Sequence, residues 1–246
     1  MDNSIFAVSD IHGQYTAFQH LLRNWDPAMP LVILGDCIDR GKDSPKVISK
    51  IIELQHKYEN KVVVLRGNHE DMLLTFLDNP TETTGLHYFR NGGDLTIKQF
   101  TEQADLSEMC FPEIAEQMKA ALHGFQSYFD QLKAYYEFGD LLFIHAGIDH
   151  TLADWRETDP YQMVWIREGW LHENKTGKII VFGHTPTRII HRSESNDVWI
   201  SENGSYIGID GGSVYGGQLN GVVLTDKGRI VQCFAEKADS PYGDVQ

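Results

Sequence analysis

Cysteine is scarce in this 246-residue chain, and its three copies, Cys37, Cys110 and Cys233, stand far apart. An odd number at such spacing cannot build a disulfide framework or a cysteine-rich zinc site. The chain also lacks an apolar run near the roughly 18 residues that a membrane span needs. Its first residues are neither basic nor apolar for long enough to form a signal peptide. We therefore expect a protein of the reducing cytoplasm that does not enter a membrane.

Positive charge is also in short supply. The sequence has 21 Lys and Arg against 35 Asp and Glu, which gives a formal net charge of -14 at pH 7. Such an acidic surface repels nucleic acid and anionic membranes, so neither is expected as a partner. A phosphate-binding site in this chain must therefore carry a strong positive centre of its own.

Short apolar, β-branched runs are frequent, and several end in a polar residue that can bind a metal. Five such runs end at Asp10, Asp36, Asn68, His145 and His184. Continuous apolar runs of this length are typical of strands buried on both faces. Helical patterns lie between them, and open α/β sheets usually place their sites at the carboxyl ends of strands. The pattern therefore predicts a layered α/β fold with these side chains gathered at one edge.

Helices and a hairpin are predicted around these strands. The pattern indicates a helix over residues 71–77 and a longer one from 112 to about 132, whereas residues 221–225 and 229–234 form a predicted hairpin. No linker divides the chain, so we expect a single domain over residues 1–246. Helices and loops at about 81–135 are expected as an insertion beside the site.

The polar residues at the strand ends make a mixed ligand set. With His12 added, it comprises two carboxylates, three imidazoles and one amide: Asp10, His12, Asp36, Asn68, His145 and His184. Oxygen and nitrogen donors of this kind favour Mn, Fe or Zn over Mg or Ca. Six ligands exceed one tetrahedral site and suit two divalent ions that share a carboxylate. Each residue alone is readily explained by capping or packing, but five that each end a separate apolar run are not.

Three linked segments have distinctive sequences: Asp10-Ile11-His12-Gly13, Gly35-Asp36-Cys37-Ile38-Asp39-Arg40-Gly41 and Gly67-Asn68-His69-Glu70. They resemble the motifs D-x-H-G, G-D-x-x-D-R-G and G-N-H-E of the phosphoprotein phosphatase family of metallophosphoesterases. The later ligand motifs follow in the right order at His145-Ala146-Gly147 and Gly183-His184-Thr185. Asn91-Gly92-Gly93 and Trp165-Ile166-Arg167 are similar to the bacterial serine/threonine protein phosphatase branch of that family.

This resemblance implies a calcineurin-like metallophosphoesterase fold, with a central β-sandwich of mixed sheets flanked by helices. It also implies that one metal is held by Asp10, His12 and Asp36. The second would be held by Asp36, Asn68, His145 and His184, with Asp36 as the bridge.

Four further roles follow from the same resemblance. Arg40 and Arg167 would clamp the phosphate oxygens, a task that suits the planar guanidinium group. His69, supported by Asp39, would protonate the leaving alkoxide. Packing between two tryptophans is the alternative for Arg167. Glu70, in the first turn of a helix, is explained by the helix dipole, and whether Tyr215 reaches the site stays open.

The implied reaction is direct hydrolysis of phosphomonoesters by a hydroxide that bridges two metal ions, with Mn favoured. The expected substrate is phosphoserine or phosphothreonine in a protein or peptide, with small phosphoesters also possible substrates. A symmetrical dinucleoside tetraphosphate hydrolase is the alternative within the enzyme class. Such enzymes usually lack the second Asp of G-D-x-x-D-R-G, so Asp39 favours the phosphatase. The alternative of another class is a non-catalytic metal-binding scaffold, which would be expected to lose a ligand.

Overall fold

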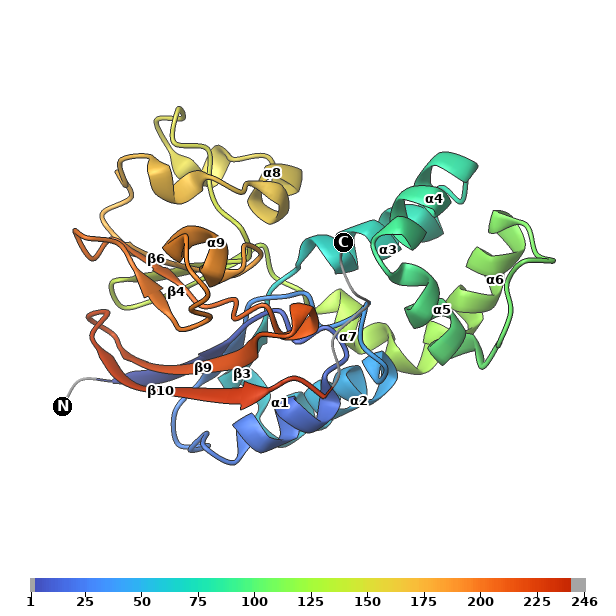
Figure 1. Ribbon diagram of the computed structural model, residues 1–246, viewed down its shortest axis with the longest axis horizontal. Coiled ribbons are helices and arrows are strands. Elements are labelled where there is room, and N and C mark those ends of the chain that lie inside the picture. The colour runs from blue at the N-terminus through green and yellow to red at the C-terminus, as the bar shows by residue number, and fades with distance from the viewer. Residues whose placement is uncertain (1–2, 240–246) are drawn as a thin grey trace.

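The computed structural model describes residues 3–239. Two five-stranded sheets stack face to face in it (Figure 1). The first sheet has the order β10-β9-β1-β2-β3, with β1 Ser4–Val8, β2 Leu31–Ile33, β3 Val62–Val64, β9 Gln218–Thr225 and β10 Ile230–Lys237. The second has the order β4-β5-β6-β8-β7, with β4 Tyr135–Phe138, β5 Leu141–Ile144, β6 Ile179–Phe182, β7 Trp199–Ile200 and β8 Tyr206–Gly208. The predicted sandwich of mixed sheets is confirmed.

The parallel strands of each sheet end at one edge. In the first sheet β1 pairs with β2 and β2 with β3 in parallel, while in the second β5 pairs with β6 and β6 with β8 in parallel. Antiparallel strands flank both parallel groups. Each set of carboxyl ends therefore delivers the residues that follow its strands to a common place.

Alternate residues of the strands enter two different cores. Ile5 and Ala7 pack between the sheets against residues such as Phe143 and Val222, whereas Phe6 and Val8 belong to the cluster beneath the helices. Side chains alternate across a strand, so a strand between two cores needs apolar residues at every position. This accounts for the continuous apolar runs in the sequence.

Helices cover the outer faces of both sheets. On the first sheet lie α1 Tyr15–Leu22 and α2 Ser44–Tyr58, followed by the 3-10 turn Glu59–Lys61. Over the second lie α8 Pro160–Trp165 and α9 Thr187–His191, with 3-10 turns at Trp155–Glu157 and Gly169–Leu171. A further 3-10 turn, Ser213–Tyr215, precedes β9. None of the helices described here is long and apolar enough to cross a membrane.

A group of helices stands beside the sheets, on the right in Figure 1. It contains α3 Asn68–Asp78, α4 Glu82–Arg90, α5 Gly93–Thr101, α6 Phe111–Ala121 and α7 Gln126–Asp130. The single helix expected from 112 to about 132 is instead divided into α6, a 3-10 turn at Leu122–Phe125 and α7. Gly124 lies in that turn, and glycine is a poor helix former, which explains the break.

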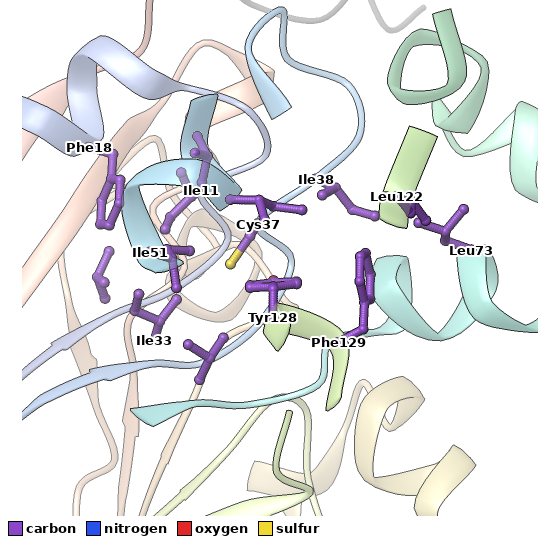
Figure 2. Packing of buried hydrophobic residues seen from close by; sticks show 14 of the residues in the cluster. Ile11, Phe18, Ile33, Cys37, Ile38, Ile51, Leu73, Leu122, Tyr128 and Phe129 are labelled. Carbon is purple, nitrogen blue, oxygen red and sulfur yellow. The ribbon is translucent and has the colours of Figure 1, made fainter. Parts of the chain in front are cut away.

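These helices share one buried cluster with the outer face of the first sheet. Figure 2 shows Tyr128 and Phe129 of α7 packed in this cluster, with Tyr128 beside Cys37. Cys37 is fully buried there and fills space in the core. The helical group is therefore packed onto the same core that supports the strand ends.

Candidate metal centre

The strand ends converge on one pocket. Its lining includes five of the six candidate metal ligands, Asp10, His12, Asp36, Asn68 and His184, together with His69 and both candidate phosphate-binding arginines. His145 is fully buried beneath them, and its Nε2 lies 3.1 Å from Asn68 Oδ1 and 3.4 Å from Asp36 Oδ1. Asp39 does not line the pocket but contacts His69, which does. The fold thus brings every predicted site residue to one place.

Asp36 occupies the middle of this group. Its Oδ2 lies 3.6 Å from His12 Nε2 and 4.0 Å from His69 Nε2, while its Oδ1 faces His145. Within residues 3–239, two groups of side chains come close enough to hold a metal, one with His12 and His69 and the other with His145 and His184. Both groups include Asp36. A shared carboxylate between two groups is what a bridging ligand requires.

The backbone at the site is strained where it turns out of the strands. Asp10, His12, Asp36 and His184 all adopt left-handed conformations, with φ of 54°, 45°, 53° and 62°. Such conformations are unfavourable for residues with a Cβ and persist only where the surroundings hold them, typically at functional sites. The His12 N–H, for example, donates to the Asp36 carbonyl oxygen at 2.8 Å. Gly67 permits close contact as well, because a Cβ there would overlap Asp36 Oδ1.

The imidazoles are oriented for binding cations. His12 Nδ1–H donates to the Ile38 carbonyl oxygen at 2.8 Å, and His145 Nδ1–H donates to the Leu34 carbonyl oxygen at 2.6 Å. With Nδ1 held by the backbone, each Nε2 points toward Asp36. Outer hydrogen bonds of this kind orient metal-binding histidines. Burial, followed by nearby positive charge, lowers the pKa of His12 well below its usual value. A neutral ring is the form that binds a metal.

The carboxylates are crowded in a way that a cation would relieve. Burial, and next the charge of Asp10, raise the pKa of both Asp36 and Asp210 well above the usual range. Nε2 of the candidate ligand His184 is also buried without a hydrogen-bond partner among the described residues. Buried charges and polar atoms are normally paired or coordinate metals. The donor set, its crowding and this unpaired ligand nitrogen therefore fit divalent metal ions.

Glu70 has a larger part than the helix dipole alone predicts. It is fully buried, and its carboxylate accepts the backbone N–H groups of Asp36 at 2.9 Å, Cys37 at 2.8 Å and Gly67 at 3.0 Å. The hydroxyl of Tyr128 donates to it at 3.1 Å. Glu70 thus holds the loop that carries Asp36, and its place as the last residue of the segment Gly67-Asn68-His69-Glu70 connects it with the site in sequence.

Asp39 is fully buried between His69 and two helices of the neighbouring group. His69 Nδ1–H donates to Asp39 Oδ2 at 2.7 Å, and the Tyr88 hydroxyl donates to Asp39 Oδ1 at 2.8 Å. The Asp39 N–H donates to Thr96 Oγ1 at 2.9 Å. Burial raises the pKa of Asp39 to about 8, and the hydrogen bonds from Thr96 and Tyr88 oppose that rise. The sequence showed no role for either Tyr88 or Thr96.

The arginines stand at the mouth of the pocket. Arg40 lies over the ring of Tyr215, 5.3 Å from its centroid, and its Nη1 is 3.2 Å from His12 Nε2. Arg167 is exposed and lines the pocket, and its Nη1 lies 3.5 Å from the His184 carbonyl oxygen. It is therefore not packed away between tryptophans, and Tyr215 does reach the site.

Asp210 is a sixth polar residue near a strand end. It follows β8 after one apolar residue, is buried, and lines the pocket. Its run, Tyr206-Ile207-Gly208-Ile209, has the same apolar character as the five that sequence analysis singled out. That signal was present in the sequence, although Asp210 was not among the predicted site residues.

Two facing mixed sheets thus carry Asp, Asn and His side chains at their carboxyl edges, with arginines at the rim of the pocket. This arrangement suits metal-assisted chemistry on a phosphate. Residues 4–213 match the calcineurin-like phosphoesterase family, and the chain belongs to that family. Its PPP-type character is supported by similarity to "Serine/threonine-protein phosphatase 1" of Salmonella typhimurium. The two are 29% identical over 231 residues, covering 87% of this chain and 89% of that protein.

Other relatives carry different names. The chain is 27% identical to an asymmetrical bis(5'-nucleosyl)-tetraphosphatase of Anoxybacillus flavithermus over 238 residues, which cover 86% of each protein. Among solved structures, a cold-active protein-tyrosine phosphatase of a Shewanella species superposes with a TM-score of 0.59 at 16% identity. That match covers 96% of this chain and 81% of the other, and at this identity it shows the fold alone.

Proposed function

We propose that this protein is a Mn-dependent serine/threonine protein phosphatase. The observation that carries the proposal is the buried Asp39–His69 pair, whose Nδ1–Oδ2 distance is 2.7 Å. With Nδ1 bound to Asp39, His69 Nε2 faces the pocket that also holds Arg40 and Arg167. A positioned acid of this kind matters most when the leaving group is a poor one. The alkoxide of serine or threonine is such a group.

The six ligand side chains are assigned to two metal ions. Asp10, His12 and Asp36 hold one ion in this proposal, and Asp36, Asn68, His145 and His184 hold the other. When bound, divalent ions of this kind lower the pKa of a water molecule and offset the negative charge of a phosphate. Mn is proposed because the donors are oxygen and nitrogen atoms of intermediate softness, with no thiolate.

The remaining polar groups act on the phosphate and the leaving group. Arg40 and Arg167 bind the non-bridging phosphate oxygens, since guanidinium groups make paired, charge-assisted hydrogen bonds to such oxygens. His69 Nε2–H donates its proton to the leaving serine or threonine oxygen. Asp39 accepts the other ring N–H, which holds the imidazole plane and stabilises the protonated ring.

Hydrolysis of dinucleoside tetraphosphates is the second candidate, because a relative of similar identity is named a bis(5'-nucleosyl)-tetraphosphatase. That relative is named asymmetrical, whereas the alternative expected from the sequence is a symmetrical hydrolase. A nucleotide is a better leaving group than an alkoxide and has less need of an acid, so the Asp39–His69 pair favours the phosphatase. The two activities differ in what they cleave: a phosphomonoester in one case and a phosphoanhydride in the other.

A comparison of rates tests the proposal. Purified protein with added Mn would be assayed on phosphoserine and phosphothreonine peptides and on diadenosine tetraphosphate. We expect a higher kcat/KM on at least one phosphopeptide. A higher kcat/KM on the tetraphosphate would replace the proposal with the second candidate. Binding of two metal ions without hydrolysis of any of these substrates would indicate a scaffold.

A further inference from the structure

We infer that Tyr88 is a positioning residue for the general acid, acting on His69 through Asp39. Tyr88 belongs to α4, outside every motif that carries the family resemblance. The inference rests on the proposed function, because it needs His69 to protonate a leaving group. It adds a requirement for the hydroxyl of one tyrosine from the helical group.

The geometry forms a continuous chain of hydrogen bonds. The Tyr88 hydroxyl donates to Asp39 Oδ1 at 2.8 Å, and Asp39 Oδ2 accepts His69 Nδ1–H at 2.7 Å. All three residues are fully buried. Each carboxylate oxygen thus has a different close donor, so rotation of the carboxylate would break both bonds.

The backbone of Asp39 makes such support necessary. Asp39 and Arg40 have φ of 69° and 65°, a left-handed conformation that is unfavourable for both. The Asp39 N–H donates to Thr96 Oγ1 of the helical group at 2.9 Å and to Ser44 Oγ of α2 at 3.2 Å. The Arg40 N–H donates to the Gly92 carbonyl oxygen at 3.5 Å. The segment that carries Tyr88 therefore supports this loop through backbone as well as side-chain contacts.

The turn between α4 and α5 is shaped around Tyr88. Gly93 begins α5, and a Cβ at that position would overlap the Tyr88 ring. Gly92 has φ of 90° and stands against Arg40, where a Cβ would come within 2.9 Å of Arg40 Cγ. The ring of Tyr88 also stacks on Phe76, with centroids 6.0 Å apart. The ring is thus held by packing, and its hydroxyl has a defined target.

A purely structural role is the competing explanation, because a buried tyrosine hydroxyl usually needs some partner. The two roles differ in how loss of the hydroxyl depends on the leaving group. Loss of packing or folding lowers the rate equally for all substrates. Loss of acid alignment lowers the rate chiefly where proton transfer is needed, as with serine phosphate, and much less with p-nitrophenyl phosphate.

Tyr88→Phe provides the test, with Tyr128→Phe as its matched control. Both changes remove one buried hydroxyl that the helical group donates to a carboxylate, Asp39 in one case and Glu70 in the other. Tyr88→Phe should lower kcat on a phosphoserine peptide by roughly 3- to 10-fold, the worth of one hydrogen bond, and should lower kcat on p-nitrophenyl phosphate less than about 2-fold. Tyr128→Phe should change both rates by one common factor, because Glu70 supports the Asp36 loop and not the acid.

A double variant separates action through Asp39 from direct action. In the Asp39→Asn background, Tyr88→Phe should cause no further loss that depends on the leaving group, since residues acting in one chain are not additive. Thr96→Val removes the closer of the two acceptors of the Asp39 N–H, Thr96 Oγ1 at 2.9 Å, and leaves Ser44 Oγ at 3.2 Å. It should show the same dependence on the leaving group if the orientation of Asp39 is what matters. If Tyr88→Phe does not fold, Thr96→Val still tests whether the contacts that the helical group makes with Asp39 affect proton transfer by His69.

The outcomes distinguish this inference from the proposed function. If the wild-type protein hydrolyses neither monoester in Mn, the proposed function fails. If the wild type is active but Tyr88→Phe or Thr96→Val lowers both rates equally, the positioning role of Tyr88 is wrong while the phosphatase proposal stands. Elemental analysis should find the same metal content in all of these variants. A loss of metal in Tyr88→Phe would also overturn the inference.

Discussion

Replacement of Glu70 by glutamine should destabilise the protein far more than the small chemical change indicates. The side-chain carboxylate accepts four hydrogen bonds and donates none. Oε2 accepts the N–H groups of Asp36 and Gly67 at 2.9 and 3.0 Å. Oε1 accepts the Cys37 N–H at 2.8 Å and the Tyr128 hydroxyl at 3.1 Å.

The amide of glutamine places an NH2 group where one of these oxygens stood. The better orientation puts it at Oε1, because the Tyr128 hydroxyl can rotate and accept, whereas the Cys37 N–H then faces another donor. One buried N–H left unpaired costs about 1–3 kcal/mol, and the remaining bonds lose their charge assistance. Relief of the repulsion between Glu70 and Asp36, which contributes to the raised pKa of Asp36, offsets part of this loss. We expect a net loss of about 2–4 kcal/mol.

Urea unfolding measures this loss, with Glu82→Gln as the control. Glu82 lies in the first turn of α4 but is exposed, so its replacement should change stability by less than about 0.5 kcal/mol. With a slope of about 3 kcal/mol per M, the Glu70→Gln midpoint in chelator should fall by roughly 1 M. The gain in stability from excess Mn should also shrink, since the Asp36 loop is loosened. Equal midpoints for the two variants would refute the assigned role of Glu70.

Three further outcomes are expected. Chelators should abolish activity and Mn should restore it, and elemental analysis should approach two metals per chain. Full activity in metal-free protein would contradict the assignment of a metal site. Asp36→Asn should lower kcat more than about 100-fold. The control Asp78→Asn, at the exposed end of α3, should leave kcat unchanged. Normal turnover with two metals bound in Asp36→Asn would show that Asp36 is not the bridging ligand. His69→Asn should keep its metals and lose roughly 10²- to 10⁴-fold on a phosphoserine peptide but much less on p-nitrophenyl phosphate; loss of metal would make His69 a ligand.

The strand ends could be predicted because their signal is local. An apolar run that stops at Asp, Asn or His reports both a buried strand and the residue that leaves it. Parallel pairing then brings Asp10, Asp36 and Asn68 to one edge without any detail of side-chain packing. The linked motifs added His69 and Arg40 by resemblance, and the structure places both at the same pocket.

Some local patterns were not enough. The helix expected from 112 to about 132 has apolar residues at helical spacing, yet it is divided near Gly124. Periodicity reports which residues become buried, and it does so equally well for two short helices that pack on the same core. Where the axis changes direction depends on the surface that each half covers.

The sequence by itself determined the five strands that end at candidate ligands, the six candidate ligands and the family resemblance, because each depends on neighbours within a few residues. Only the tertiary structure decided what surrounds them. Tyr88 is 49 positions from Asp39, and Tyr128 is 58 positions from Glu70. A tyrosine in a helix pattern is indistinguishable from ordinary core until the fold shows what its hydroxyl meets. That partner is set by how the helical group packs beside the sheets, which no local pattern encodes.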